Sequence, residues 1–115
     1  NNSENRIKTF FDWDIKNAQY EGKTWEQQCK EIITELPEKV YISYDIDGLD
    51  PKLCPNTGTP VAGGFEIEQI NFLIRELVSS GKKIIGFDLN EVGNDEWDAN
   101  VGARVLYRLC NFLAL

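Results

Sequence analysis

Residues 43–64, SYDIDGLDPKLCPNTGTPVAGG, lead from an apolar segment into a loop rich in Gly, Thr and Pro. Residues 40–46 are rich in β-branched and aromatic side chains on nearly both faces, which is typical of a strand buried in a parallel sheet. Asp45 and Asp47 stand at its carboxyl end. Because alternate side chains of a strand share a face, we expect both carboxylates on one side, about 7 Å apart along the backbone. That arrangement suits a hard divalent cation.

The segments around this stretch alternate between helix and strand. Apolar spacing and a capping-box pattern predict a helix over 24–36, and a second helix is predicted from Ile67 until Gly81 stops it. Residues 83–89, KIIGFDL, have the composition of another buried strand, and 98–113 carry the apolar face of a closing helix. The order helix, strand, helix, strand, helix predicts an α/β fold with a parallel sheet.

Two acidic segments, 45–50 and 88–91, follow the two predicted strands. In parallel α/β sheets, ligands bind beyond the carboxyl ends of the strands. We therefore expect the functional site where these two segments meet.

The first part of the chain has no clear period. Residues 7–10 are predicted to form a further strand or a buried loop. We expect the aromatic side chains of this region to pack in the core and not to form a stacking platform: Phe10, Phe11, Trp13, Tyr20 and Trp25.

Composition limits the class of protein. The 115 residues suffice for one small domain, and the absence of Met and the start at Asn1 lead us to expect a fragment or a processed piece. The net charge of -7 argues against nucleic acid or an anionic membrane as a partner and favours a small cationic ligand. Three Cys without a CxxC pair, no apolar run long enough to span a bilayer and no signal-peptide pattern predict a cytoplasmic location.

Two other families place aspartates at similar spacing. An EF-hand loop counted from Asp45 would place Asp50 at the position of the turn glycine and Asn56 at the twelfth, so calcium binding of that kind is excluded. The haloacid dehalogenase superfamily has a nucleophilic aspartate in an Asp-x-Asp-Gly-Thr motif, but Leu49 stands here in place of the threonine. A phosphatase of that kind is the less favoured alternative.

SYDIDGLDP followed by PNTGTPVAGG resembles the second signature of the ureohydrolases, the family of arginase, agmatinase and formimidoylglutamase. Residues 84–92, IIGFDLNEV, resemble the next strand of that family, and 98–113 resemble its C-terminal helix, so the resemblance extends from Arg6 onward. It implies that residues 1–115 are a C-terminal fragment of a single ureohydrolase-like domain with a three-layer α/β/α fold.

The resemblance also implies roles for four residues. Asp45 and Asp47 would be ligands of a binuclear manganese centre and so belong to the catalytic site, whereas a solvated strand end is the structural alternative. Glu91 would pair with the guanidinium or amidine group of the substrate, or else be a surface glutamate. Thr59 would line the pocket. We expect Asp50 to hydrogen-bond its own turn, and Asp88 either to support a residue of the site or to have a structural role.

The ligands that the family takes from a Gly-Gly-Asp-His segment and an Asp-x-His-x-Asp run lie upstream of the matching region, and this chain has no His. We therefore expect either a catalytically incomplete part of a manganese hydrolase or a non-catalytic binding or assembly module. Formimidoylglutamate, arginine and agmatine are the candidate substrates, and EGKTWEQQC and DEWDANVGAR favour the first. An open sheet edge predicts a homo-oligomer.

Overall fold

The computed structural model describes residues 6–114, and the chain divides between Leu36 and Pro37 into two compact units. The first unit contains α2 (Asp12–Tyr20) and α3 (Trp25–Thr34). The predicted cap of α3 is confirmed, because Thr24 Oγ1 accepts from the backbone N–H of Gln27 and the Gln27 side chain accepts from the N–H of Thr24. The helix α2 was not predicted, since its apolar residues show little amphipathic order.

Two predictions for the first unit are wrong. Residues 7–10 form neither a strand nor a buried loop, because they have no regular structure and exposed side chains. The aromatic side chains of Phe10, Phe11, Trp13 and Tyr20 are 41% to 86% exposed and do not form a core. The rings of Phe11 and Trp13 stack on each other with centroids 4.8 Å apart. Part of their apolar surface is therefore covered locally.

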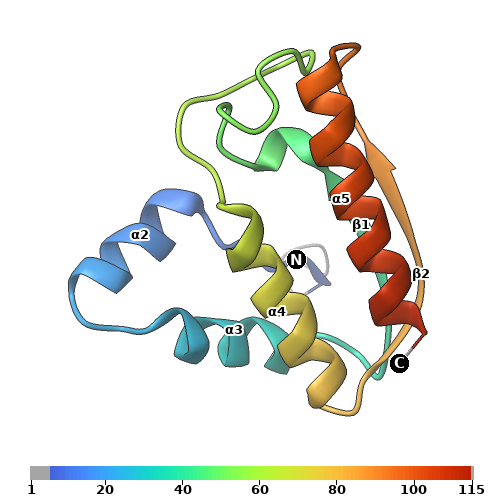
Figure 1. The fold of residues 1–115 in the computed structure, drawn as a ribbon. Helices are drawn as coiled ribbons and strands as arrows, with labels where there is room; N and C mark the ends of the chain where they lie inside the picture. The colour runs from blue at the N-terminus through green and yellow to red at the C-terminus, as the bar shows by residue number, and fades with distance from the viewer. Residues whose placement is uncertain (1–5, 115) are drawn as a thin grey trace. The chain divides into compact units, whose positions relative to one another are not determined.

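The second unit contains the predicted alternation of helices and strands. Its elements are β1 (Lys39–Asp45), the 3₁₀ turn η1 (Ile46–Gly48), α4 (Ile67–Ser79), β2 (Lys83–Asn90) and α5 (Glu96–Leu113). The two strands pair in parallel, with Ser43 opposite Asp88 and Asp45 opposite Asn90. Figure 1 shows α5 running along the strands, and the loop after β1 reaching the end of the sheet where α5 begins. The carboxyl ends of both strands therefore lie beside this loop.

The core of the second unit lies between one face of the sheet and the helices α4 and α5. Its buried residues come from β1, the following loop and both helices: Tyr44, Ile46, Leu49, Cys54, Ile74, Val101, Val105, Leu109 and Phe112. The opposite sheet face is open in the described residues, since Tyr41 is 55% and Ile85 57% exposed. The prediction of strands buried on both faces is therefore wrong for this chain, because the helices of this unit cover one face.

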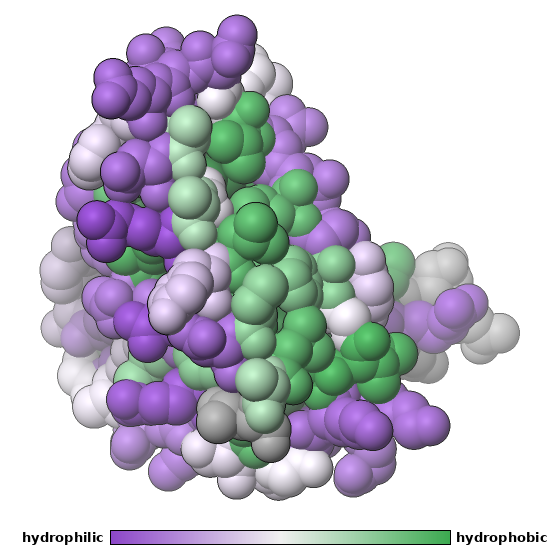
Figure 2. All heavy atoms as spheres, turned by 45° about the vertical axis from the view of Figure 1, so that its right-hand side comes forward, coloured by the Kyte–Doolittle hydropathy of each residue, from purple (hydrophilic) through white to green (hydrophobic). Residues whose placement is uncertain are grey.

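Hydrophobic side chains also gather on the surface. Figure 2, which brings forward the side that carries α5 and β2, shows them as a continuous band bordered by hydrophilic residues. Between residues 6 and 114, none of the helices is both long and apolar enough to cross a membrane.

Candidate functional site

Asp45 and Asp47 lie where β1 ends. Asp45 is the last residue of the strand, and Asp47 lies in η1. Strand alternation therefore stops before Asp47, and the expected extended spacing of the two carboxylates is wrong, since a 3₁₀ turn is tighter than a strand. Among residues 6–114, the Asp45 carboxylate has no hydrogen-bond or ion-pair partner, whereas Oδ2 of Asp47 accepts a 2.9 Å hydrogen bond from the Thr59 hydroxyl.

The loop between η1 and α4 folds back on the end of β1. The N–H of Phe65 donates to the carbonyl oxygen of Gly48 at 3.0 Å, and the N–H of Asp50 donates to the carbonyl oxygen of Phe65 at 2.9 Å. Gly64 has φ +92°, and a Cβ there would lie 2.8 Å from Gly48 O. This return requires glycine, and it closes the loop that carries Thr59 to Asp47.

Asp50 has the role that its position before Pro51 predicted. Its Oδ1 accepts a 2.9 Å hydrogen bond from the backbone N–H of Lys52, two residues along the chain. This local bond is typical of an aspartate that starts a turn.

Glu91 follows β2 directly and has φ +69°, a left-handed conformation that is rare for residues other than glycine. The hydroxyl of Thr57 donates a 2.7 Å hydrogen bond to the Glu91 carbonyl oxygen. A Cβ on Gly58 would lie 3.6 Å from Glu91 Oε2, so the carboxylate lies against the backbone of Gly58. Because Thr59 is the next residue, three consecutive loop residues connect Glu91 with Asp47.

Asp98 was missed by sequence reasoning, although it is fully buried in the first turn of α5. Both of its oxygens accept hydrogen bonds from Asn56. Its spacing carried a signal, because a step of three residues leads to buried Val101 and a further four to buried Val105. A carboxylate on the apolar face of a predicted helix needs polar partners.

Asp88 lies on the open face of the sheet. Its Oδ1 accepts a 2.9 Å hydrogen bond from the Ser43 hydroxyl on the neighbouring strand. This bond, with smaller effects from Tyr41 and Asn90, lowers the pKa of the Asp88 carboxyl. The contacts agree with the structural one of the two roles expected for it.

Two buried polar side chains lie behind the site. The Cys54 thiol donates to the Ile46 carbonyl oxygen at 3.3 Å. Burial raises the pKa of this thiol, and the negative charges of Asp98 and Asp47 raise it by smaller amounts. Burial also raises the pKa of Tyr44, whose hydroxyl has no hydrogen-bond partner in the described part of the chain. Neither group is available as a nucleophile near neutral pH.

The donor set agrees with manganese in kind but not in number. Carboxylate oxygens suit this hard ion, and Asp45 and Asp47 present them at one strand end. In the region from residue 6 to 114, however, no three His, Cys, Asp or Glu side chains come together to hold a metal.

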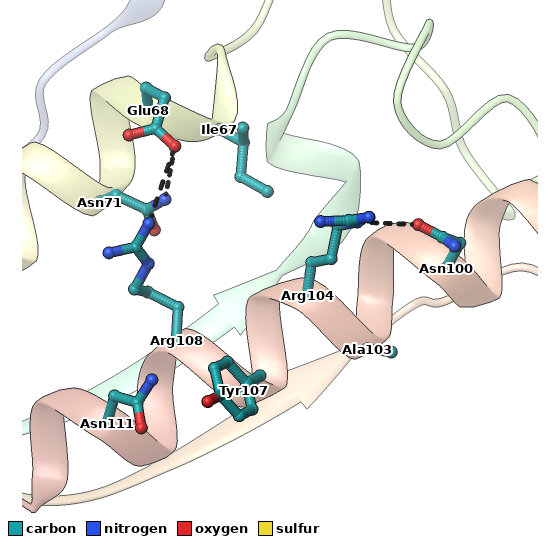
Figure 3. Close-up of a pocket in the computed structure, with 9 residues that line it drawn as sticks. All are labelled: Ile67, Glu68, Asn71, Asn100, Ala103, Arg104, Tyr107, Arg108 and Asn111. Atoms are coloured by element: carbon teal, nitrogen blue, oxygen red, sulfur yellow. Dashed lines mark hydrogen bonds and ion pairs between the residues drawn. The ribbon is translucent and has the colours of Figure 1, made fainter.

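A groove of about 740 Å³ lies between α4 and α5 (Figure 3). Arg104 Nε donates to Asn100 there, and Arg108 lies 4.0 Å from Glu68. None of Asp45, Asp47, Thr59 and Glu91 lines this groove, so it is separate from the candidate site.

Comparison with known proteins identifies the family. The profile of the Arginase family matches residues 3–111. N(1)-aminopropylagmatine ureohydrolase of Thermus thermophilus is 40% identical over 77 residues, which cover 66% of this chain and 26% of that protein. Guanidinobutyrase of Pseudomonas aeruginosa is 37% identical over 95 residues, which cover 74% of this chain and 29% of that protein. The chain thus spans less than a third of the length of these relatives.

The fold agrees with this match. The crystal structure of arginase from Bacillus subtilis superposes with a TM-score of 0.75 at 23% identity, covering 98% of this chain and 38% of that one. The predicted α/β fold and the resemblance to ureohydrolases are confirmed, and the dehalogenase-like alternative is not retained. With nearly its whole length matched by the family profile, the chain belongs to the arginase family.

Proposed function

We propose that this chain is the C-terminal part of a manganese-dependent hydrolase that cleaves a C–N bond in a guanidino or formimino substrate. The convergence of Asp47 and Glu91 on loop residues 57–59 carries the proposal. It places acidic groups from the ends of two parallel strands beside one loop, which is where α/β sheets bind ligands.

Each acidic residue has a separate task. Asp45 and Asp47 would hold manganese, with further ligands from outside the described residues, and the metal would supply Lewis acidity at the end of β1. Thr59 would orient Asp47 through its hydrogen bond. The Glu91 carboxylate, which has no partner among residues 6–114, would accept two parallel N–H bonds from the planar cationic group of the substrate and so fix its direction.

The relatives support a guanidino substrate over a formimino one. Their names describe a ureohydrolase of N(1)-aminopropylagmatine and a guanidinobutyrase. Formimidoylglutamate, arginine and agmatine stay candidates, because the groups that read the remainder of the substrate are not among the residues described here.

Product analysis tests the proposal. The protein expressed from its complete reading frame is loaded with manganese and incubated separately with agmatine, arginine, 4-guanidinobutyrate and formimidoylglutamate. Release of urea identifies a guanidino substrate, and release of formamide identifies the formimino one. If neither product forms while manganese is bound, the proposal of catalysis is wrong and a binding or assembly module is the remaining function.

We also propose that the protein forms a homo-oligomer in the cytoplasm. In the described residues the sheet has only the strands β1 and β2, so each of them has an unpaired edge, which supports self-association. Sedimentation of a single monomeric species at high concentration would contradict this.

A further inference from the structure

The strongest unexplained feature of the chain is the buried carboxylate of Asp98. It is 0% exposed, and it accepts a hydrogen bond from the backbone N–H of Asn56 at 3.0 Å and another from the Asn56 side-chain amide at 3.1 Å. A buried charge is costly unless it is paired or hydrogen-bonded. Asn56 therefore meets the need of Asp98, and the two residues form a fixed pair between the loop and α5.

The pair of Asn56 and Asp98 lies next in the chain to Thr57, the residue that holds the backbone of Glu91. Asn56 precedes Thr57, whose hydroxyl donates to the Glu91 carbonyl oxygen at 2.7 Å. The segment from Glu91 to Asp98 is thus tied at both ends to two adjacent loop residues. Glu91 has φ +69°, a backbone conformation that residues with a side chain rarely adopt, so its surroundings must hold it there.

Gly93 shows how tightly this segment encloses Asn56. A Cβ at Gly93 would lie 2.5 Å from the carbonyl oxygen of Asn56 and 2.7 Å from Asp98 Oδ2. Real Cβ atoms do not approach so closely, so the turn after β2 closes around Asn56 because residue 93 has no side chain. The position of Asn56 is therefore fixed by close backbone packing as well as by hydrogen bonds.

We propose that Asp98 is a positioning residue which, through Asn56 and Thr57, holds the left-handed backbone of Glu91 and so aims its carboxylate at the cationic group of the substrate. The aim depends on the loop because Glu91 Oε2 lies against Gly58, two residues after Asn56. The proposal rests on the proposed function for the identity of the substrate group. Its structural part, the control of Glu91 by Asp98, stands independently of that function.

A reciprocal exchange of the two side chains tests this pair. Asn56→Asp places two carboxylates against each other, and Asp98→Asn places two amides there. In the double variant Asn56→Asp/Asp98→Asn, the amide at 98 accepts from the backbone N–H of residue 56 and donates to the new carboxylate, so both hydrogen bonds re-form. Glu96→Gln and Asn94→Asp are matched controls, because they exchange a carboxylate for an amide and an amide for a carboxylate at exposed neighbouring positions.

The first measurement is amide hydrogen exchange of a peptide containing residues 91–93, with a peptide from α4 as the internal reference. The second is KM for the guanidino substrate that the product analysis identifies. We expect Asn56→Asp to increase the rate of amide exchange at residues 91–93 and the KM by about tenfold each. The double variant should return both values to within about threefold of those of the unchanged protein. The two control variants leave both values unchanged.

Two results separate the proposals from each other. If the double variant is no better than Asn56→Asp, or if exchange at 91–93 does not respond, Asp98 does not position Glu91 and the inference is overturned. The second result is that exchange at 91–93 increases in Asn56→Asp and recovers in the double variant while KM stays constant. In that case Asp98 does position Glu91, but the role of Glu91 in substrate binding is wrong.

Discussion

The hydroxyl of Thr59 donates a 2.9 Å hydrogen bond to Oδ2 of Asp47, twelve residues earlier in the chain. The bond joins the tip of the glycine-rich loop to the 3₁₀ turn after β1. A hydrogen bond to a carboxylate oxygen restricts the orientation of the carboxylate, and groups that orient metal ligands in this way contribute to metal affinity.

Thr59→Val should therefore weaken manganese binding. The variant keeps the shape of the side chain and removes the donor, and we expect the affinity to fall about tenfold, at the lower end of the effect of losing such a partner. Electron paramagnetic resonance of free manganese during titration of the complete protein measures this. Thr59→Ser retains the hydroxyl and should bind as the unchanged protein does, and equal affinity of the Val variant would remove Thr59 from the metal site.

Glu91→Gly should raise the stability of the protein and lower its catalytic activity. Glycine adopts φ +69° without the steric cost that a side chain has, so the free energy of unfolding should rise by up to about 1 kcal/mol. Loss of the carboxylate should lower kcat/KM by about 100-fold, the scale of a lost charged hydrogen-bond pair. Urea unfolding and steady-state kinetics measure the two effects.

Glu91→Ala is the matched control for this trade-off. It loses the same carboxylate but keeps a Cβ in the left-handed conformation, so it should lose activity without the gain in stability. If the Gly and Ala variants have equal stability, the strain assigned to Glu91 is absent.

The meeting of the two acidic segments could be predicted from local sequence pattern, whereas the roles of Asp47, Thr59 and Glu91 come from the resemblance to the family. The apolar run before Asp45 and the periodic helices around it determine a parallel strand pair, and their carboxyl ends bring Asp47 and Glu91 to one edge. The η1 turn could not be predicted in this way, because its first residue, Ile46, continues the apolar pattern of the strand. It is closed by the hydrogen bond from the N–H of Leu49 to the Ile46 carbonyl oxygen, and Gly48 accepts another from Phe65 on the returning loop. Nor could the pair of Asn56 and Asp98 be predicted, since it joins residues 42 positions apart through tertiary folding.

The aromatic residues of the first unit show where prediction from composition failed. Composition predicted a core for residues such as Trp13, yet burial depends on what packs over a side chain, and Trp13 stacks on Phe11 in a locally exposed segment. Aromatic content alone therefore does not determine which face is covered.

The thiol of Cys54 should resist alkylation in the folded protein. Burial and the nearby charges of Asp98 and Asp47 raise its pKa, which lowers the fraction of reactive thiolate at pH 8. Cys110 is exposed and Cys29 is buried, so iodoacetamide should modify Cys110 alone until the protein is unfolded. Mass spectrometry of the peptides gives the sites. Labelling of Cys54 at the rate of Cys110 would show that the loop opens.

The same pKa shift gives stability a pH dependence. In the unfolded chain the Cys54 thiol ionises near its ordinary pKa of about 8.5, whereas burial raises its pKa in the folded protein. The folded state thus binds more protons above this pH, so the free energy of unfolding should fall as pH rises from 8 to 10. Urea unfolding across this range should show a smaller fall for Cys54→Ala, and parallel curves would contradict the assignment.

Tyr44→Phe should be neutral or stabilising, which is unusual for a change at a side chain only 7% exposed. The Tyr44 hydroxyl is buried without a hydrogen-bond partner in the described residues, so its removal relieves a desolvation cost of about 1 kcal/mol. Tyr41→Phe is the matched control, because Tyr41 is 55% exposed and the nearby Asp88 carboxylate raises the pKa of its hydroxyl. A loss of stability in Tyr44→Phe, measured by urea unfolding, would mean that the hydroxyl has a partner in solution.

The 115 residues purified alone should bind manganese weakly and release no urea or formamide. Two aspartates at one strand end offset little of the repulsion between two cations, and residues 6–114 bring no third His, Cys, Asp or Glu to them. Titration with manganese should show an affinity much lower than that of the complete protein, with Asp45→Asn/Asp47→Asn as the control that lacks both carboxylates. Because catalysis needs an anchored metal as well as Glu91, turnover by the isolated chain would require further metal ligands within these 115 residues. It would overturn the division of the site between this chain and the remainder of the protein.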